Sequence, residues 1–80
     1  MTCSEVVIQR IRNLCDERGI TINKLSTLSG LTQSTLNNII HGTNKNPRLN
    51  TLYKIATGLN MTVSEFFDFP EMNDTIFDDE

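Results

Sequence analysis

Apolar residues recur at helical spacing through the first 67 residues of this 80-residue chain. The first such stretch can begin at Ser4, a suitable N-cap, and end at Gly19. Its apolar stripe consists of Val7, Ile11, Leu14 and Cys15. Apolar and polar residues alternate nowhere for long enough to make a strand. The sequence therefore predicts an all-α fold.

Glycines and capping residues divide the next part of the chain into two further helices. Thr21 can cap a second helix that Gly30 ends, and Thr32 can cap a third that runs to about His41, with Gly42 as its stop. The apolar side of the second helix is predicted to be Ile22, Leu25 and Leu28. The turn between these two helices must be very short.

Two more helices follow a polar loop that contains Pro47. The fourth helix begins at Asn50 or a neighbour, and Gly58 is expected to weaken its last turn. Its apolar face is Leu52, Ile55, Ala56 and Leu59. Thr62 and Glu65 form a capping box that opens a fifth helix with Val63, Phe66 and Phe67. We expect a compact five-helix domain.

Charge is distributed unevenly along the chain. The formal net charge is -3, but residues 1–67 hold all seven basic residues and only four acidic ones. Residues 68–80 hold six acidic residues and no basic one. We therefore expect one domain over 1–67 and an acidic tail over 68–80. The tail also contains Phe69, Met72, Ile76 and Phe77, so it is either partly disordered or docks on the domain or on a dimer partner.

Several function classes are not supported by this composition. Cys3 and Cys15 lack partners at metal-ligand spacing and are read as free thiols, with Cys15 in the core. His41 is the single histidine, so neither a metal cage nor a histidine-based triad can be assembled, and we expect no enzyme and no cofactor. The apolar runs are too short to cross a membrane, which predicts a soluble, cytoplasmic protein.

The third predicted helix has an unusual exposed face. In SGLTQSTLNNIIHG, residues 29–42, the apolar residues Leu36, Ile39 and Ile40 fall on one side at about 100° per residue. The other side carries Gln33, Ser34, Asn37 and Asn38, although Asn is a poor helix former. Amides both donate and accept, and Gln or Asn can form a matched pair of hydrogen bonds with adenine in the major groove. This face is predicted to read DNA bases, in preference to merely solvating the helix.

The two helices with their tight glycine turn have the form of a helix-turn-helix, and at this point the chain resembles a family. RIRNLCDERGITINKLSTLSGLTQSTLNNIIHG and NPRLNTLYKIATGLNMTVSEFF resemble the lambda-repressor-like, or Cro/C1-type (XRE), helix-turn-helix domains over about residues 6–67. The resemblance implies base reading by Gln33, Ser34 and Asn38, with Asn37 a weaker candidate. It also implies contacts to the DNA backbone from Thr21, Asn23, Lys45 and Arg48, and we add Thr32, Thr43 and Asn46 as further candidates for backbone contact.

The chain also departs from that family's usual pattern. Ile22 stands where many relatives have a Gln that contacts the backbone, and Ser26 replaces the usual Ala at a tight helix contact. Cys15 and Ile40 stand where many relatives carry a buried Arg and Glu that pair. Because a matched apolar substitution of such a pair can be neutral, these two departures are consistent with each other.

The leading hypothesis is a transcriptional regulator, expected to be a repressor that binds a palindromic operator as a homodimer through its third helix. The alternative is a protein-interaction module, for example antitoxin-like or regulator-binding, that has the same fold without sequence-specific DNA binding. The weak net basicity and the acidic tail favour this alternative, in which the C-terminal helix or tail would contact a protein partner.

Overall fold

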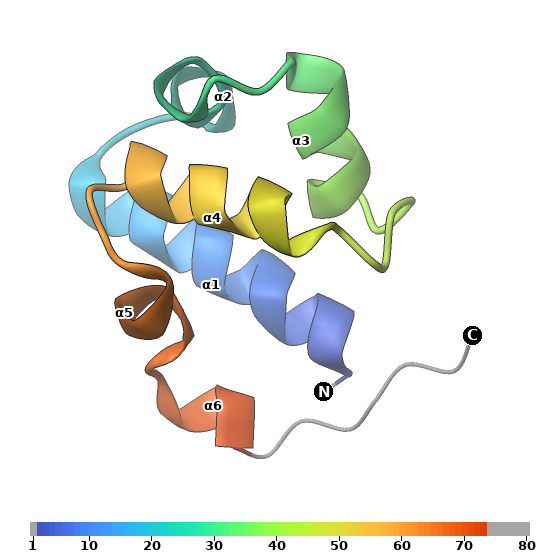
Figure 1. The fold of residues 1–80 in the computed structure, drawn as a ribbon, viewed down its shortest axis with the longest axis vertical. Coiled ribbons are helices and arrows are strands. Elements are labelled where there is room, and N and C mark those ends of the chain that lie inside the picture. The colour runs from blue at the N-terminus through green and yellow to red at the C-terminus, as the bar shows by residue number, and fades with distance from the viewer. Residues whose placement is uncertain (1, 74–80) are drawn as a thin grey trace.

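Six helices make up the part of the chain that the structure, a computed structural model, describes, which is residues 2–73 (Figure 1). They are α1 (Cys3–Arg18), α2 (Ile22–Ser29), α3 (Gln33–Ile40), α4 (Leu49–Gly58), α5 (Val63–Phe67) and α6 (Pro70–Asn73). Residues 2–73 contain no strand, so the all-α prediction is confirmed. The sixth helix was not predicted. It lies in the expected acidic tail and begins at Pro70, because proline is well suited to a first helical position.

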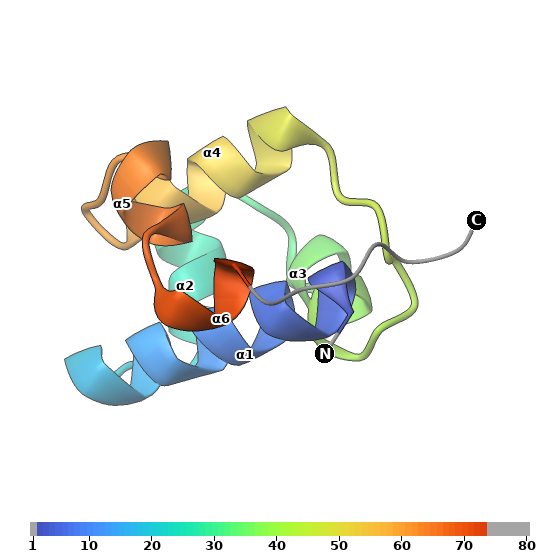
Figure 2. The ribbon, with the colours of Figure 1, turned by 90° about the horizontal axis from the view of Figure 1, so that it is seen from below.

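The helices pack around one core, with α2 in extensive contact with α4 and α3 packed on α2. Figure 2 shows α1 on one side of the bundle and α4 and α5 on the other. The first five helices all contribute buried side chains. The core is Val7, Ile11, Leu14, Cys15, Leu25, Leu36, Ile39, Ile40, Ile55, Ala56, Leu59 and Phe66. The apolar stripes predicted on α1, α3 and α4 thus face this core.

The two cysteines are both free thiols, as predicted. Cys15 is 3% exposed and belongs to the core, together with Ile40. Burial, with a smaller contribution from Asp16, raises the pKa of the Cys15 thiol. Because the thiolate is the reactive form, Cys15 acts as a small apolar core residue.

The first helix begins earlier than predicted. Thr2 is the N-cap in place of Ser4, which lies inside the helix. The N–H of Glu5 donates to Thr2 Oγ1 at 3.4 Å, and the N–H of Thr2 donates to Glu5 Oε1 at 3.0 Å. If Ser4 were the N-cap, the residue three positions on would be Val7, whose side chain cannot accept a hydrogen bond from the backbone. Thr2 and Glu5 form both bonds of a capping box, so Thr2 is the better N-cap.

The capping box predicted for the fifth helix is confirmed. The N–H of Glu65 donates to Thr62 Oγ1 at 3.1 Å, and the N–H of Thr62 donates to Glu65 Oε1 at 2.9 Å. Hydrogen bonds to the Glu65 carboxyl from the Thr62 N–H and, to a smaller extent, from the Thr62 side chain lower the pKa of that carboxyl. The charged form of Glu65 is therefore the form that closes the start of α5.

One predicted core residue is exposed. Leu28 was expected on the buried side of α2, but its side chain is 47% exposed. The buried side of this helix instead contains Leu25, Ser26 and Ser29. The prediction failed at Leu28 because the close contact with α4 at Gly58 puts the small residue Ser29, and not Leu28, on the buried side of α2.

Arg10 connects the two ends of the described chain. Its Nε donates to the carbonyl oxygen of Phe66 at 2.9 Å, and its Nη2 donates to that of Glu65 at 3.0 Å. The guanidinium carbon also lies 4.8 Å from the centroid of the Phe69 ring. Arg10 thereby binds two carbonyl groups at the end of α5, of which that of Glu65 also accepts from the N–H of Asp68 at 3.2 Å, and holds the segment leading to α6 against α1.

Gly58 permits the close contact between α2 and α4. A Cβ atom at this position would collide with Ser29 Oγ and would lie 3.0 Å from the Ser29 nitrogen and 3.1 Å from its Cα. The sequence suggested only that Gly58 weakens the last turn of α4. The structure shows that the missing side chain lets the two helix backbones approach.

We expect Gly58→Ala to destabilise the protein by about 1–3 kcal/mol, because the added methyl group overpacks the contact with Ser29. The same change in an open helix would stabilise by up to about 1 kcal/mol, so the sign of the effect is diagnostic. Urea unfolding followed by circular dichroism measures it. Thr57→Ala, at an exposed neighbouring position, is the control and should stay within about 0.5 kcal/mol of the unmodified chain. A Gly58→Ala chain of unchanged or higher stability would contradict the prediction.

Candidate nucleic-acid interface

The third helix separates its apolar and polar residues onto opposite faces. Leu36, Ile39 and Ile40 are buried in the core. Gln33, Ser34 and Asn38 are exposed, whereas Asn37 is half-buried. The geometry thus leaves three hydrogen-bonding side chains fully available on one surface and Asn37 at its edge.

The turn between α2 and α3 presents that surface at the edge of the molecule (Figure 1). Gly30 ends α2 with a φ of +70°, a left-handed conformation that favours glycine, and its N–H donates to the Ser26 and Thr27 carbonyl oxygens. The N–H of Leu31 also donates to Ser26 O, at 3.0 Å. Only residues 30–32 separate the two helices, so the orientation of α3 follows directly from that of α2.

The threonines at the starts of α2 and α3 are N-caps. Thr21 Oγ1 accepts from the N–H of Lys24 at 3.0 Å, and Thr32 Oγ1 accepts from the N–H of Thr35 at 3.1 Å. Both threonines and the neighbouring Asn23 are exposed. Other N–H groups in the first turn of a helix have no partner within the helix and point outward, where an anion can accept from them.

The loop after α3 is tied to that helix. The N–H of Asn44 donates to Asn38 O at 2.9 Å, and the N–H of Asn46 donates to Asn44 Oδ1 at 3.0 Å. Asn44 was not among the predicted site residues, although an Asn that bonds two residues ahead is a common turn signal. The four predicted loop residues are all exposed, namely Thr43, Lys45, Asn46 and Arg48. The loop therefore places its two cations beside the end of α3.

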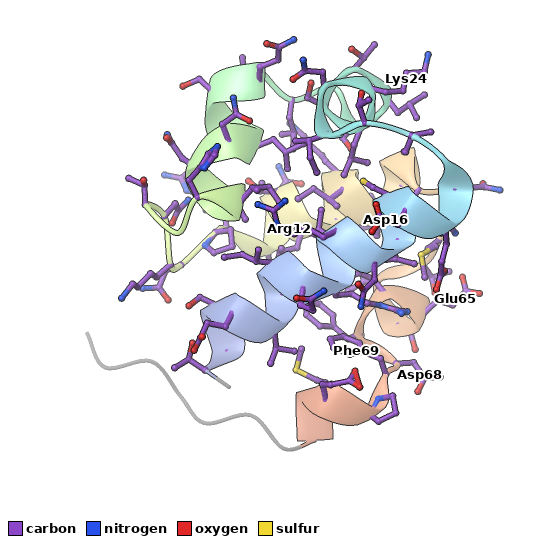
Figure 3. The ribbon with its side chains drawn as sticks, turned by 180° about the vertical axis from the view of Figure 1, so that it is seen from behind. Arg12, Asp16, Lys24, Glu65, Asp68 and Phe69 are labelled. Atoms are coloured by element: carbon purple, nitrogen blue, oxygen red, sulfur yellow. The ribbon has the colours of Figure 1, made fainter. Side chains whose placement is uncertain are left out.

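Carboxylates are absent from the central part of the sequence. Residues 18–64 contain Arg18, Lys24, Lys45, Arg48 and Lys54 but no Asp or Glu. This stretch includes α2, α3, the following loop and α4. In Figure 3, Lys24 lies at the α2 end of the molecule, whereas Glu65 and Asp68 lie at the end formed by α5 and α6. The surface around α3 thus carries positive charge that the net charge of the chain conceals.

Two other kinds of site, a metal centre and a membrane span, can be compared with the described residues. Among residues 2–73 there is no group of three or more His, Cys, Asp or Glu side chains that could hold a metal ion. Within the same range, no helix has the length and apolar character needed to span a bilayer. The exposed face of α3 and the loop beside it remain the most distinctive surface in this part of the chain.

Comparisons with known proteins agree with this geometry. Residues 10–71 match the Cro/C1-type HTH DNA-binding domain family. The crystal structure of the prophage Lp1 protein 11 is similar, with a TM-score of 0.80 and 38% identity over 91% of this chain and 96% of that one. An HTH_3 family transcriptional regulator from Vibrio cholerae has a TM-score of 0.68 and 33% identity over 76% of this chain, which spans 34% of that protein. A search of curated proteins found no match.

We expect Thr32→Ala to lower the free energy of unfolding by about 1 kcal/mol, because the N–H of Thr35 loses its capping acceptor. Thr32→Ser keeps the hydroxyl and should retain most of the stability. Thermal and urea unfolding of the three chains measure the difference. Thr43→Ala, in the exposed loop, serves as the matched control. If Thr32→Ala and Thr43→Ala behave alike, the cap does not hold the start of α3.

Proposed function

The chain belongs to the Cro/C1-type helix-turn-helix DNA-binding domain family, and we propose that it binds a specific DNA sequence with α3 in the major groove. In this proposal residues 1–67 form the DNA-binding domain. The observation that carries it is the exposed polar face of α3, where Gln33, Ser34 and Asn38 present hydrogen-bonding groups without charge. Such groups match base edges, which require directional partners.

The residues around α3 are proposed to hold the DNA backbone. Lys45 and Arg48 in the exposed loop supply positive charge, and the beginnings of α2 and α3 supply outward N–H groups. The proposed backbone contacts are Thr21, Asn23, Thr32, Thr43, Lys45, Asn46 and Arg48. Because phosphate contacts carry no sequence information, these residues would set affinity and register while α3 sets the preferred sequence.

We further propose that the protein acts as a homodimeric repressor on a palindromic operator, with half-sites about 34 Å apart along the DNA. Phe66 is fully buried and Phe67 half-buried, so of these two rings only part of Phe67 is left exposed. Leu49 and Tyr53 lie one turn apart on α4 and are 70% and 58% exposed. This pair supports an interface between subunits on α4, because large exposed apolar side chains commonly mark a partner surface.

In vitro selection from random DNA should return a palindromic sequence. For the selected site we expect Gln33→Ala and Asn38→Ala each to lower affinity by about 1–3 kcal/mol, while binding to random DNA changes little, because base-edge hydrogen bonds are lost. Fluorescence anisotropy with both duplexes measures this. Asn13→Ala, an exposed amide on α1, is the matched control. Selection that returns no preferred sequence would contradict the proposal and favour a protein-interaction module.

The loop cations should behave differently from the amides. We expect Lys45→Ala and Arg48→Ala to weaken binding to the selected and random duplexes alike, because each removes a phosphate contact. Each should also reduce the slope of log affinity against log salt by about 1. Arg18→Ala, which removes an exposed cation from the last turn of α1, is the control and should leave the slope unchanged. A slope unaffected by the loop variants would exclude the loop from the DNA interface.

A further inference from the structure

A hollow of about 150 Å³ lies between the first turns of α1 and the loop that follows α3. Its walls are mainly apolar and include Val7, Ile8, Ile39, Leu52 and Phe67. Ile8, Leu52 and Phe67 are only half-buried, so the hollow opens onto unfilled apolar surface. A cavity of about this volume admits a ring the size of benzene. We call this hollow the α1–loop groove.

The rim of the α1–loop groove includes Lys45. This lysine is exposed and lies in the loop whose cations are proposed to contact the DNA backbone. Figures 1 and 2 both place the first turn of α1 at the same end of the molecule as that loop. An occupant of the groove that carried negative charge would therefore compete directly with a phosphate for Lys45.

The chain itself contains a segment with the complementary chemistry. Residues 74–80, which lie outside the described part, read DTIFDDE. Phe77 supplies an aromatic ring, and it is followed immediately by Asp78, Asp79 and Glu80. An apolar anchor followed by acids matches an apolar hollow with a lysine at its rim.

The starting point of this segment also favours the groove. Met72 in α6 packs against the core, and α6 contacts α1, whose first turns form one wall of the groove. Phe77 lies five positions after Met72 in the sequence, and an extended chain of five residues reaches about 16 Å. The longest extent of the molecule is 30 Å, so this reach covers about half of it. Docking within one chain requires this reach to span the distance from Met72 to the groove.

We propose that residues 74–80 dock in the α1–loop groove of their own chain, with Phe77 in the hollow and the following acids beside Lys45. Docking places carboxylates next to Lys45 and lowers the affinity for DNA. This second consequence rests on the proposed function, whereas the docking itself does not. The acidic segment then serves as a built-in competitor of the DNA backbone.

Phe77→Ser in the full-length chain is the test of docking, because it removes the anchor and leaves every charge in place. Methyl NMR should show shifted signals for Ile8, Ile39 and Leu52, and the unmodified chain should show nuclear Overhauser contacts from the Phe77 ring to these methyl groups. Phe77→Leu, which stays apolar, is the matched control and should shift them less. Methyl signals that Phe77→Ser leaves unchanged would overturn the proposal. Contacts found only between differently labelled chains would overturn docking within one chain.

Binding to random duplex DNA tests the competition. Phe77→Ser should raise the affinity by about threefold or more at low salt, and Phe77→Leu should not. If neutralising Asp78, Asp79 and Glu80 to amides raises the affinity but Phe77→Ser does not, the tail acts by charge alone and the proposed competition through docking is overturned. If the unmodified chain binds no DNA, the proposed function fails, and the methyl signals still decide whether the tail docks.

Discussion

The close contact between α2 and α4 is the constraint on which the position of α3 depends. Gly58 and Ser29 bring the two backbones together, and a single methyl group at residue 58 would not fit between them. Ser29 is followed at once by Gly30 and the short turn into α3. Any shift of α2 away from α4 would therefore move the start of α3 with it. This close contact has a cost in folding free energy, because the buried Ser29 Oγ has no hydrogen-bond partner.

The third helix combines two roles within eight residues. Its apolar side, which includes Leu36, fills the core, and this burial fixes the direction of the polar side that carries Gln33 and Asn38. The caps at Thr21 and Thr32 use hydroxyl groups in place of carboxylates. An acidic cap would be equally good for a helix, but it would introduce negative charge next to the proposed DNA backbone contacts. The absence of acids from residues 18–64 is consistent with that demand.

Local patterns in the sequence were sufficient to predict much of the fold and of the candidate site. Residues within four positions of each other determine several of these features. They determine the apolar stripes of α1, α3 and α4, the glycine ends of α1 and α2, and the Thr62 capping box. The burial of Leu28 was predicted wrongly and the packing role of Gly58 was not predicted, because both environments are set by a helix distant in sequence. The bonds from Arg10 to the end of α5 join residues more than fifty positions apart, and no periodicity signals them. The roles proposed for the polar face of α3 remain predictions.

The placement of charge explains why the net value of -3 is a poor guide to this protein. Residues 18–64 carry no acid and residues 68–80 carry no base, and the fold places Glu65 and Asp68 at the end opposite Lys24 (Figure 3); only α1 carries charges of both signs. Arg10 maintains this separation, because its bonds to the α5 carbonyl oxygens and its contact with Phe69 fasten the start of the acidic stretch to α1. Exposed charges more than about 10 Å apart are largely screened at physiological salt. The basic surface around α3 can therefore act on a nearby polyanion as though the distant acids were absent, unless the chain brings its last residues back to it.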